Sequence, residues 1–272
     1  MNKLSEINAT KRERVATAKM SVPLDRLRVA ASQRRAEAVA HSLRAALSNS
    51  ARTNIIAEFK RRSPSKGIIR KEADITAIVR EYGGGGAAAI SVLTEEDYFD
   101  GSLDDLRAVR SITTLPILRK DFIFDEYQIY ESAAAGADAL LLIVAALDDE
   151  NLSKLRKLAE DELGMDALVE VHTRDEMRQA VDFGANIIGI NNRDLTTFDV
   201  SLETSIALAE MAPPDAILVS ESGIQSPTDI STLHRAGYRG FLIGEALMKA
   251  GDAKTLLKQL TEIRQTATVD AS

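Results

Sequence analysis

Short apolar segments alternate with helical patterns from residue 54 onward, and this alternation constrains the fold more than any other feature. The segments expected as strands are Asn54–Lys60, Ala88–Leu93, Pro116–Lys120, Ala139–Ile143, Ala167–Val171, Ile187–Asn191, Ile217–Glu221 and Gly240–Ile243. The segments expected as helices are Ile75–Tyr82, Leu103–Val109, Glu126–Ala134, Asp149–Leu163, Arg174–Asp182, Leu202–Met211 and Pro227–Ala236, with another after Ala246. Strands that alternate with helices indicate βαβ units and a parallel sheet, and continuous apolar runs fit strands covered on both faces. Eight such units favour a closed (β/α)8 barrel of the TIM type, an α/β fold, over an open sheet.

The first 53 residues differ in character from the rest of the chain. We expect residues 1–53 to form an additional N-terminal helical segment that packs on the barrel of residues 54–265, within a single domain. A barrel closes its own sheet, so residues 1–48 are expected to be dispensable for completing the core. Leu24–Leu47 is expected as one amphipathic helix, with Val39 at the start of a buried apolar stripe.

Composition excludes several classes of function. The 272-residue chain has a net charge of −7, which argues against a nucleic-acid partner because such partners require basic patches. It has no cysteine and three histidines without ligand spacing, so we expect no disulfide and no metal site. The longest apolar run is too short to cross a bilayer, and the first twenty residues lack the apolar core of a signal peptide. We therefore expect a cytoplasmic protein with no membrane association.

Charged residues lie at the ends of three expected strands, where barrel enzymes have their active sites. Glu58 and Lys60 share one face of the first strand, although a solvated ion pair is the alternative. Lys120 ends the third strand, where a lone lysine could simply be exposed, and Glu170 lies near the end of the fifth. Together these four charges would surround one mouth. Interleaved lysines and carboxylates can be held in a partly desolvated cavity and supply acids and bases.

A phosphate site is expected from the loops after the last two strands. Ser222 and Gly223 follow the seventh strand, and Gly244 and Glu245 follow the eighth. Barrels frequently bind phosphate at these two loops, and glycine lets backbone N–H groups approach an anion. The alternative is that both glycines only make tight turns. Glu245 is expected to present only its backbone to the ligand, and Ser63 and Lys66 after the first strand are additional candidate contacts.

His172 follows Glu170 by two residues and could reach the same mouth. An ordinary loop histidine is at least as good an interpretation, so no role is assigned to it.

Several segments closely resemble the indole-3-glycerol phosphate synthase family. They are AEFKRRSPSKG (57–67), AAAISVLTEEDYFDGSL (87–103), LRKDFI (118–123), ADALLLIVAAL (137–147), LVEVH (168–172), GINNRDL (189–195), SESGI (220–224) and FLIGEALM (241–248). The resemblance covers essentially the whole barrel. It implies closure, decarboxylation and dehydration of 1-(2-carboxyphenylamino)-1-deoxyribulose 5-phosphate to indole-3-glycerol phosphate, a step of tryptophan biosynthesis. It also implies that an additional N-terminal helix packs by the mouth.

The resemblance implies roles for individual residues. Lys120 is expected as the general acid of ring closure and Glu170 as the general base of dehydration, while Lys60 holds the substrate carboxylate, protonates the departing hydroxyl, or does both. Glu58 and Glu221 are expected to position the lysines and the sugar hydroxyls, and Asn191 to orient the substrate or Glu170. The remaining expected substrate contacts are Ser63, Phe122, Leu141, Arg193, Ser222, Gly223, Leu242, Gly244 and Glu245, of which Phe122 and Leu141 supply an apolar wall. The substrate's own nitrogen drives carbon–carbon bond formation, so no cofactor is expected, and no obligate protein partner is evident.

Two rival functions remain at this point. One is another phosphate-binding barrel enzyme, such as a phosphoribosyl isomerase, which would not require this set of lysines and glutamates. The other is a non-catalytic barrel subunit, which should have lost its rim charges because unused buried charges cost stability.

Overall fold

The computed structural model describes residues 3–194 and 197–261, and within these residues eight parallel strands close into a barrel. The barrel closes because β1 (Asn54–Phe59) pairs with β4 (Ala89–Leu93) on one side and with β10 (Gly240–Ile243) on the other. The strands between them are β5 (Ile117–Lys120), β6 (Ala139–Ile143), β7 (Asp166–Val171), β8 (Ile187–Asn191) and β9 (Ile217–Glu221). Each strand lies within one residue of its expected bounds, so the expected barrel is confirmed.

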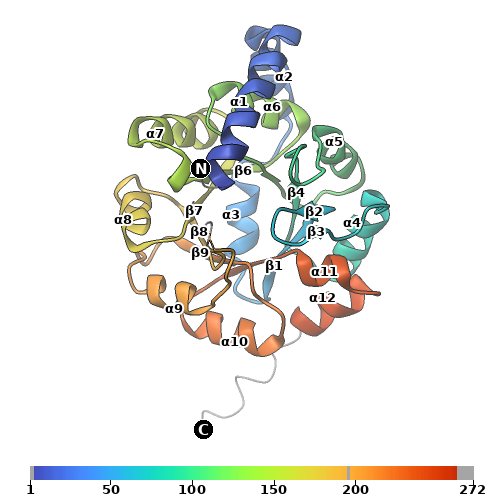
Figure 1. Ribbon diagram of the computed structural model, residues 1–272, viewed down its shortest axis with the longest axis vertical. Coiled ribbons are helices and arrows are strands. Elements are labelled where there is room, and N and C mark those ends of the chain that lie inside the picture. Colours follow the sequence, from blue (N-terminus) through green and yellow to red (C-terminus); the bar gives the residue numbers. More distant parts are fainter. Residues whose placement is uncertain (1–2, 195–196, 262–272) are drawn as a thin grey trace.

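Helices surround the strands (Figure 1). They are α4 (Ile75–Gly84), α5 (Leu103–Ile112), α6 (Glu126–Ala135), α7 (Asp149–Lys157), α8 (Arg174–Asp182), α9 (Glu203–Ala209), α10 (Pro227–Arg235), α11 (Glu245–Lys249) and α12 (Ala253–Thr261). A short 3-10 turn (Val144–Ala146) follows β6, and a π-helical segment (Leu158–Glu162) continues α7. Side chains that prefer N-cap positions begin many of these helices, as Ser226 does in the capping box of α10. A two-stranded hairpin, β2 (Arg62–Ser63) and β3 (Gly67–Ile68), occupies the loop after β1.

Alternation along each strand produces two separate hydrophobic cores. Ile55 and Ala57 of β1 belong to the larger core between the barrel and its helices, whereas Ile56 points into the barrel interior. The interior core also includes one to three apolar side chains from each of the other strands. Because successive side chains point to opposite faces, Glu58 and Lys60 continue the inward face of β1 toward the mouth. The apolar filling therefore occupies the lower barrel and leaves the upper end to polar groups.

The segment from Leu24 to Leu47 is not the single helix expected from the sequence. It forms α2 (Leu24–Ala36), which packs along α6, and a separate short helix α3 (Ser42–Leu47). Val39 lies between them and is 72% exposed, so its assignment to a buried stripe was wrong. The break occurs at His41, which is left-handed (φ 50°) and donates its backbone N–H to Gly164 O.

Helix α3 closes the lower end of the barrel and is visible through it in Figure 1. Leu43 and Leu47 are fully buried in the interior core beside Ile56. The Asp166 carboxylate at the start of β7 accepts the backbone N–H of Arg44 at 2.9 Å, which caps α3 from across the barrel. The expectation that residues 1–48 are dispensable for the core was therefore wrong, because two of them complete it.

Helix α1 (Lys3–Ser21) lies at the opposite end, beside the mouth. It buries Leu4, Ile7 and Val15, and the buried Lys11 pairs with Glu96 at 2.7 Å. Lys11 also pairs at 2.9 Å with the buried Asp121, the residue after Lys120. The helix at the mouth that the resemblance implied is thus α1, rather than any part of the segment from residue 24 to residue 47.

Removing residues 1–22 is expected to lower kcat/KM by about tenfold or more, because the mouth loses one wall and Asp121 loses its α1 partner. The barrel should still unfold cooperatively, at a lower temperature, since α3 remains. Steady-state kinetics and circular dichroism melts on the truncated chain measure both effects. Lys11→Met in the full chain removes the ion pair with Asp121 but keeps the apolar contacts of α1, so it separates the two contributions. Unchanged kinetics in the truncated chain would show that α1 stabilises the surface without contributing to the site.

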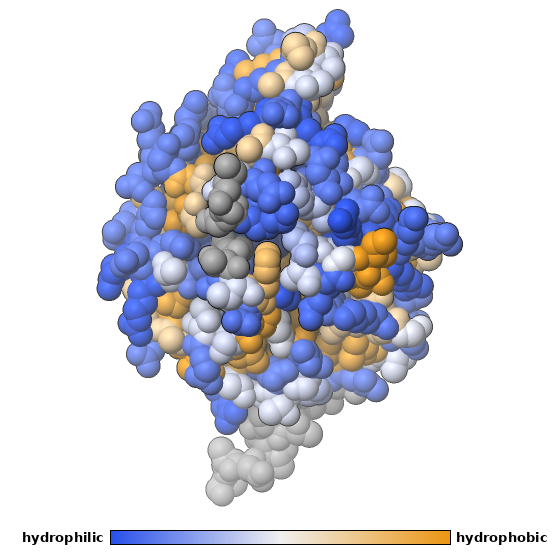
Figure 2. Space-filling view, in the orientation of Figure 1, coloured by the Kyte–Doolittle hydropathy of each residue, from blue (hydrophilic) through white to orange (hydrophobic). Residues whose placement is uncertain are grey.

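The face around the mouth is largely hydrophilic (Figure 2). Large apolar side chains that are exposed among the described residues are Met20, Val22, Val29, Val39, Ile68 and Val200. Across residues 3–194 and 197–261, no helix has both the length and the apolar character needed to span a bilayer.

Candidate active site

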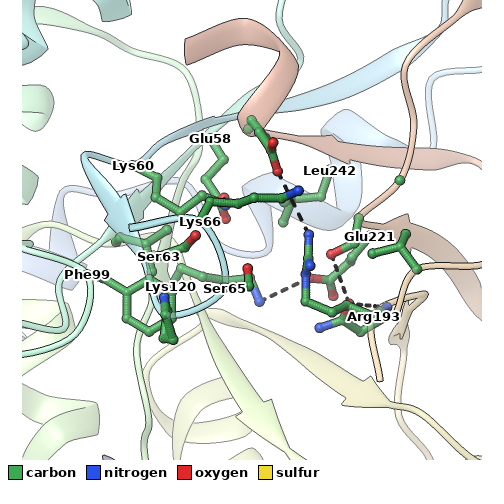
Figure 3. Close-up of a pocket in the computed structure, with 18 of the residues that line it drawn as sticks. Glu58, Lys60, Ser63, Ser65, Lys66, Phe99, Lys120, Arg193, Glu221 and Leu242 are labelled. Carbon is green, nitrogen blue, oxygen red and sulfur yellow. Dashed lines mark hydrogen bonds and ion pairs between the residues drawn. The ribbon is translucent and has the colours of Figure 1, made fainter. Parts of the chain in front are cut away.

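A cavity of about 730 Å³ opens at the carboxyl ends of the strands. Its size falls in the range typical of small-molecule sites. Every site residue expected from the sequence lines it: Glu58, Lys60, Ser63, Lys66, Lys120, Phe122, Leu141, Glu170, Asn191, Arg193, Glu221, Ser222, Gly223, Leu242, Gly244 and Glu245. Figure 3 shows Glu58, Lys60 and Lys66 on one side of the cavity, with Glu221 and Arg193 on the other.

Lys120 lies between two carboxylates at the buried end of the cavity. Its Nζ is 2.7 Å from Glu170 Oε2 and 3.0 Å from Glu221 Oε2, and all three side chains are buried or nearly so. Burial alone would lower the pKa of Lys120, but the two carboxylates outweigh it and raise the pKa above its ordinary value. Lys120 is therefore an ammonium group at neutral pH, with protons to donate.

Glu58 and Lys60 form a second pair on the opposite wall. Lys60 Nζ donates a hydrogen bond of 2.6 Å to Glu58 Oε1, and the glutamate is almost fully buried. The solvated ion pair considered from the sequence does not describe this geometry. The inward face of β1 therefore brings one cation and one anion into the cavity.

Glu221 shares the Lys120 ammonium with Glu170. Burial, only partly offset by Lys120 and reinforced by repulsion from Glu170, raises the pKa of Glu221 to about 7. Its Oε1 is buried and has no hydrogen-bond partner among the described residues. That oxygen occupies the space above Gly189, where an added Cβ would lie only 2.2 Å from it. Near neutral pH Glu221 can therefore bind or release a proton beside the Lys120 ammonium.

Glu170 is held as a carboxylate. Burial would raise its pKa, but Lys120, His172 and the Asn191 side chain lower the pKa to about 2. Asn191 is oriented for this contact, because its Oδ1 accepts from Ser222 Oγ at 2.9 Å and from Arg193 N at 3.1 Å. Its amide nitrogen is thereby left to donate to Glu170.

The two glycine loops lie beside each other at the rim. Ser222 and Gly223 both adopt positive φ (67° and 84°), a conformation that is strained for serine. Asn192 holds this turn by donating from Nδ2 to Ser222 O at 3.0 Å. Gly244 is needed for a different reason, because a Cβ there would lie 2.5 Å from Glu58 Oε1.

The side chain of Glu245 contacts two cations at the rim, whereas the sequence analysis expected only its backbone at the ligand. Its carboxylate accepts a 2.6 Å hydrogen bond from Lys249 Nζ and lies 3.9 Å from Arg193 Nη2. The hydrogen bond from Lys249 lowers the pKa of Glu245. The rim therefore carries several cations, Lys60, Lys66, Arg193 and Lys249, around this one carboxylate.

Comparison with known proteins assigns the chain to a family. The family model described as indole-3-glycerol phosphate synthase matches residues 4–260. The chain is 47% identical over 261 residues to the indole-3-glycerol phosphate synthase of Carboxydothermus hydrogenoformans, covering 94% of this chain and 98% of that relative. The chain belongs to the indole-3-glycerol phosphate synthase family. A second relative with the same name, from Lachnoclostridium phytofermentans, is 49% identical over 210 residues, with 77% of each chain covered.

Solved structures support the barrel fold of this chain. The chain resembles 3-hexulose-6-phosphate synthase from Salmonella typhimurium with a TM-score of 0.61 at 13% identity, covering 76% of this chain and 96% of that one. At this identity the likeness supports only the barrel architecture.

Sequence reasoning missed part of the apolar wall in this member of the indole-3-glycerol phosphate synthase family. Phe99 lines the cavity with its ring centre 6.2 Å from that of Phe122, and Leu4 and Ile7 of α1 line it as well. Phe99 had a weak signal, because it lies in the loop after the second strand, as Phe122 lies in the loop after the third. The stripe Leu4, Ile7 and Val15 has helical spacing, but the buried Lys11 interrupts it.

Proposed function

We propose that this chain converts 1-(2-carboxyphenylamino)-1-deoxyribulose 5-phosphate to indole-3-glycerol phosphate, carbon dioxide and water, and that the residues lining the cavity perform the reaction as follows. The observation that carries the assignment of roles is the position of Lys120 between Glu170 and Glu221 at the buried end of the cavity. It supplies a proton donor and a proton acceptor 2.7 Å apart.

Ring closure requires an acid at the sugar ketone. The aromatic carbon that bears the carboxylate attacks the ketone carbon, and the ketone oxygen gains the electron pair. Lys120 donates a proton to that oxygen, which prevents an alkoxide from forming in a buried site. The attack disrupts aromaticity and leaves an iminium on the anilino nitrogen, so a proton donor placed at the ketone has a large effect on the barrier.

Decarboxylation follows from the same intermediate. The bond to the carboxylate breaks, its electron pair restores the aromatic ring and neutralises the iminium, and carbon dioxide leaves. Lys60 holds the carboxylate until that step, with Glu58 keeping its ammonium in place through the 2.6 Å hydrogen bond. Phe99, Phe122 and Leu141 pack against the ring and exclude water from it.

Dehydration completes the indole. The former ketone oxygen leaves as water after a second proton is donated, by Lys60 or Lys120, and Glu170 removes a proton from the methylene carbon next to nitrogen. Glu170 is suited to this task because it is ionised and Asn191 orients it. The cycle donates two protons and recovers one, so it takes up one proton per turnover. Glu221, with its pKa near 7, is suited to exchange that proton with Lys120.

The substrate phosphate is assigned to the rim between the two glycine loops. Backbone N–H groups of the Ser222–Gly223 turn and of Gly244 would bind it, with Ser63, Lys66 and Arg193 adding side-chain contacts. The remote phosphate then anchors the substrate while the buried end carries out the chemistry.

Gly244→Ala is expected to raise KM by about tenfold or more, because the new methyl group obstructs the backbone and displaces Glu58. The inhibition constant of inorganic phosphate should rise in parallel. Gly251→Ala is the matched control, since an added Cβ meets nothing within 4 Å there. A lower kcat with an unchanged inhibition constant for phosphate would mean that the phosphate binds elsewhere. The substitution would then act only by displacing Glu58.

The proposed reaction is tested by incubating the purified chain with the anilino substrate. Indole absorbance and carbon dioxide should appear in equal amounts. The chain has no tryptophan, so indole fluorescence of the product is read against a low protein background. Turnover of a phosphoribosyl isomerase substrate without indole formation would favour the rival barrel enzyme.

A further inference from the structure

His172 lies directly above Glu170 on the inward face of the barrel, and the mechanism above does not use it. The two residues are separated by one position, so their side chains share a face. His172 Nε2 lies 3.4 Å from Glu170 Oε1, the carboxylate oxygen that does not contact Lys120. The imidazole side chain is 10% exposed and the Glu170 side chain 3% exposed.

A second carboxylate holds the other side of the imidazole. Glu176, in the first turn of α8, accepts the backbone N–H of His172 at 2.7 Å, and its Oε2 lies 3.2 Å from His172 Nδ1. One carboxylate therefore fixes both the backbone and the ring of His172. The result is a chain of contacts, Glu176 to His172 to Glu170 to Lys120, that leads from the start of α8 into the catalytic cavity.

The positions of the two ring nitrogens of His172 favour the protonated imidazolium. Each ring nitrogen lies near a carboxylate oxygen, and Nε2 is buried and makes no hydrogen bond to the described residues, so its 3.4 Å approach to Glu170 Oε1 is an ion-pair contact. A neutral imidazole has one N–H and one lone pair, so one nitrogen would direct a lone pair at a carboxylate. The imidazolium presents an N–H to both.

We infer that His172 is a positioning residue, an imidazolium fixed by Glu176 that holds the Glu170 carboxylate in place for the base step. The inference rests on the proposed function of Glu170. Removing the charge of His172 removes the cation beside Oε1 of Glu170, so the carboxylate is held less firmly toward the substrate while Lys120 still binds Oε2.

The charged surroundings of His172 favour its protonated form. Burial lowers its pKa, but the hydrogen bond to Glu176 and the charges of Glu170 and Glu221 raise it above the ordinary value. The opposing cation is Lys120 of β5, on the far side of Glu170. Arg193, Asp194 and Asp199 of the loop after β8 border the small pocket beside the ring.

The sign of the pH effect follows from these contacts. Below the pKa of His172 the imidazolium is present and kcat is at its upper level. As pH rises through that pKa, His172 loses its charge and kcat should fall by about tenfold. This is less than the roughly 100-fold loss that a 1 Å misplacement of a catalytic group can cause, because Lys120 still holds Glu170. KM should change little, because the phosphate contacts are remote.

The test combines NMR titration of the labelled histidine rings with kcat measured across pH. The chain has only three histidines, so the His172 signal is assigned by its loss in His172→Gln. Wild-type kcat should show a step at the NMR pKa of His172, and His172→Gln should remain at the lower level throughout. Glu176→Gln keeps an oxygen that can accept the backbone N–H of His172 but removes the charge, so it should lower the pKa of His172 and move the step with it, by about one pH unit.

His41→Asn is the matched control. His41 also contacts a buried carboxylate, Asp166 at 3.2 Å, but at the closed end of the barrel, so this variant should alter stability without moving the step. The inference is overturned if wild type shows no step at the NMR pKa, if His172→Gln keeps the step, or if Glu176→Gln moves the pKa without moving the step. Should His172→Gln not fold, wild type and Glu176→Gln alone decide the question.

Failure of the proposed function gives a different pattern. A Glu170→Gln variant with normal turnover would remove Glu170 from the reaction. The pKa of His172 should still fall in that variant, because the contact between the two side chains does not depend on catalysis.

Discussion

Lys120→Met is expected to lower kcat by at least the roughly 10²–10⁴-fold typical of a lost general acid. Ring closure would then leave a negative oxygen at the buried end of the cavity with no donor beside it. KM should change much less, because Lys120 is at the buried end and the phosphate contacts are at the rim. Steady-state kinetics with indole fluorescence as the readout measures both constants.

The same variant has a predictable effect on the two carboxylates. Glu170 and Glu221 lose the cation that lies within 3.0 Å of both, so their pKa values should rise and one or both should bind a proton. Lys258→Met, at an exposed position on α12, is the matched control and should leave kcat unchanged. Near-normal turnover of Lys120→Met would remove Lys120 from the mechanism and assign the acid to Lys60.

Glu170→Gln is expected to lower the rate of indole formation by about 10²–10⁴-fold, as for a lost general base. Ring closure and decarboxylation do not use this base, so the first turnover should release carbon dioxide in an amount close to that of the enzyme, with little indole. Rapid-quench measurement of carbon dioxide and indole in one experiment separates the steps. The amide retains a similar shape and Glu221 still pairs with Lys120, which keeps the site assembled.

Glu150→Gln, on the exposed surface of α7, is the control for this substitution. If Glu170→Gln produces carbon dioxide and indole together at a reduced rate, Glu170 acts before decarboxylation. If both rates are normal, another group is the base, and Glu221 is the candidate because its pKa is near 7.

The barrel, the charges at three strand ends and the glycine loops were accessible from local periodicity, whereas Asn191, Arg193, Glu221 and the apolar wall were expected from the family resemblance. An apolar strand followed by an amphipathic helix repeats eight times, and the period of two along a strand determines which residues point inward. This periodicity placed Glu58 and Lys60 on one face near a strand end and Lys120 at the end of its strand, and the structure shows that all three line the cavity. The glycine loops followed from their position directly after the last two strands.

The pairing of charges could not be obtained in this way. Lys120 contacts Glu170, 50 residues later, and also Glu221, two strands further around the barrel. Which carboxylate reaches which lysine depends on the stagger of the closed sheet, and no short segment encodes that stagger. The raised pKa of Glu221 has the same origin, because burial and neighbours from three other strands produce it together.

The N-terminal segment likewise has features that the sequence predicts and features that only tertiary contacts determine. The sequence by itself determined that residues 24–47 favour helix, but it could not show where the helix ends. The break at His41 depends on Gly164 and Asp166, which lie more than 120 residues away and supply the hydrogen bonds that a continuous helix would otherwise make itself. Only the tertiary structure places Leu43 and Leu47 under the barrel and Lys11 beside Asp121. Burying the two leucines gains free energy only once the closed barrel provides the space that receives them, and the charge of Lys11 can be buried only where the folded chain brings a carboxylate to it.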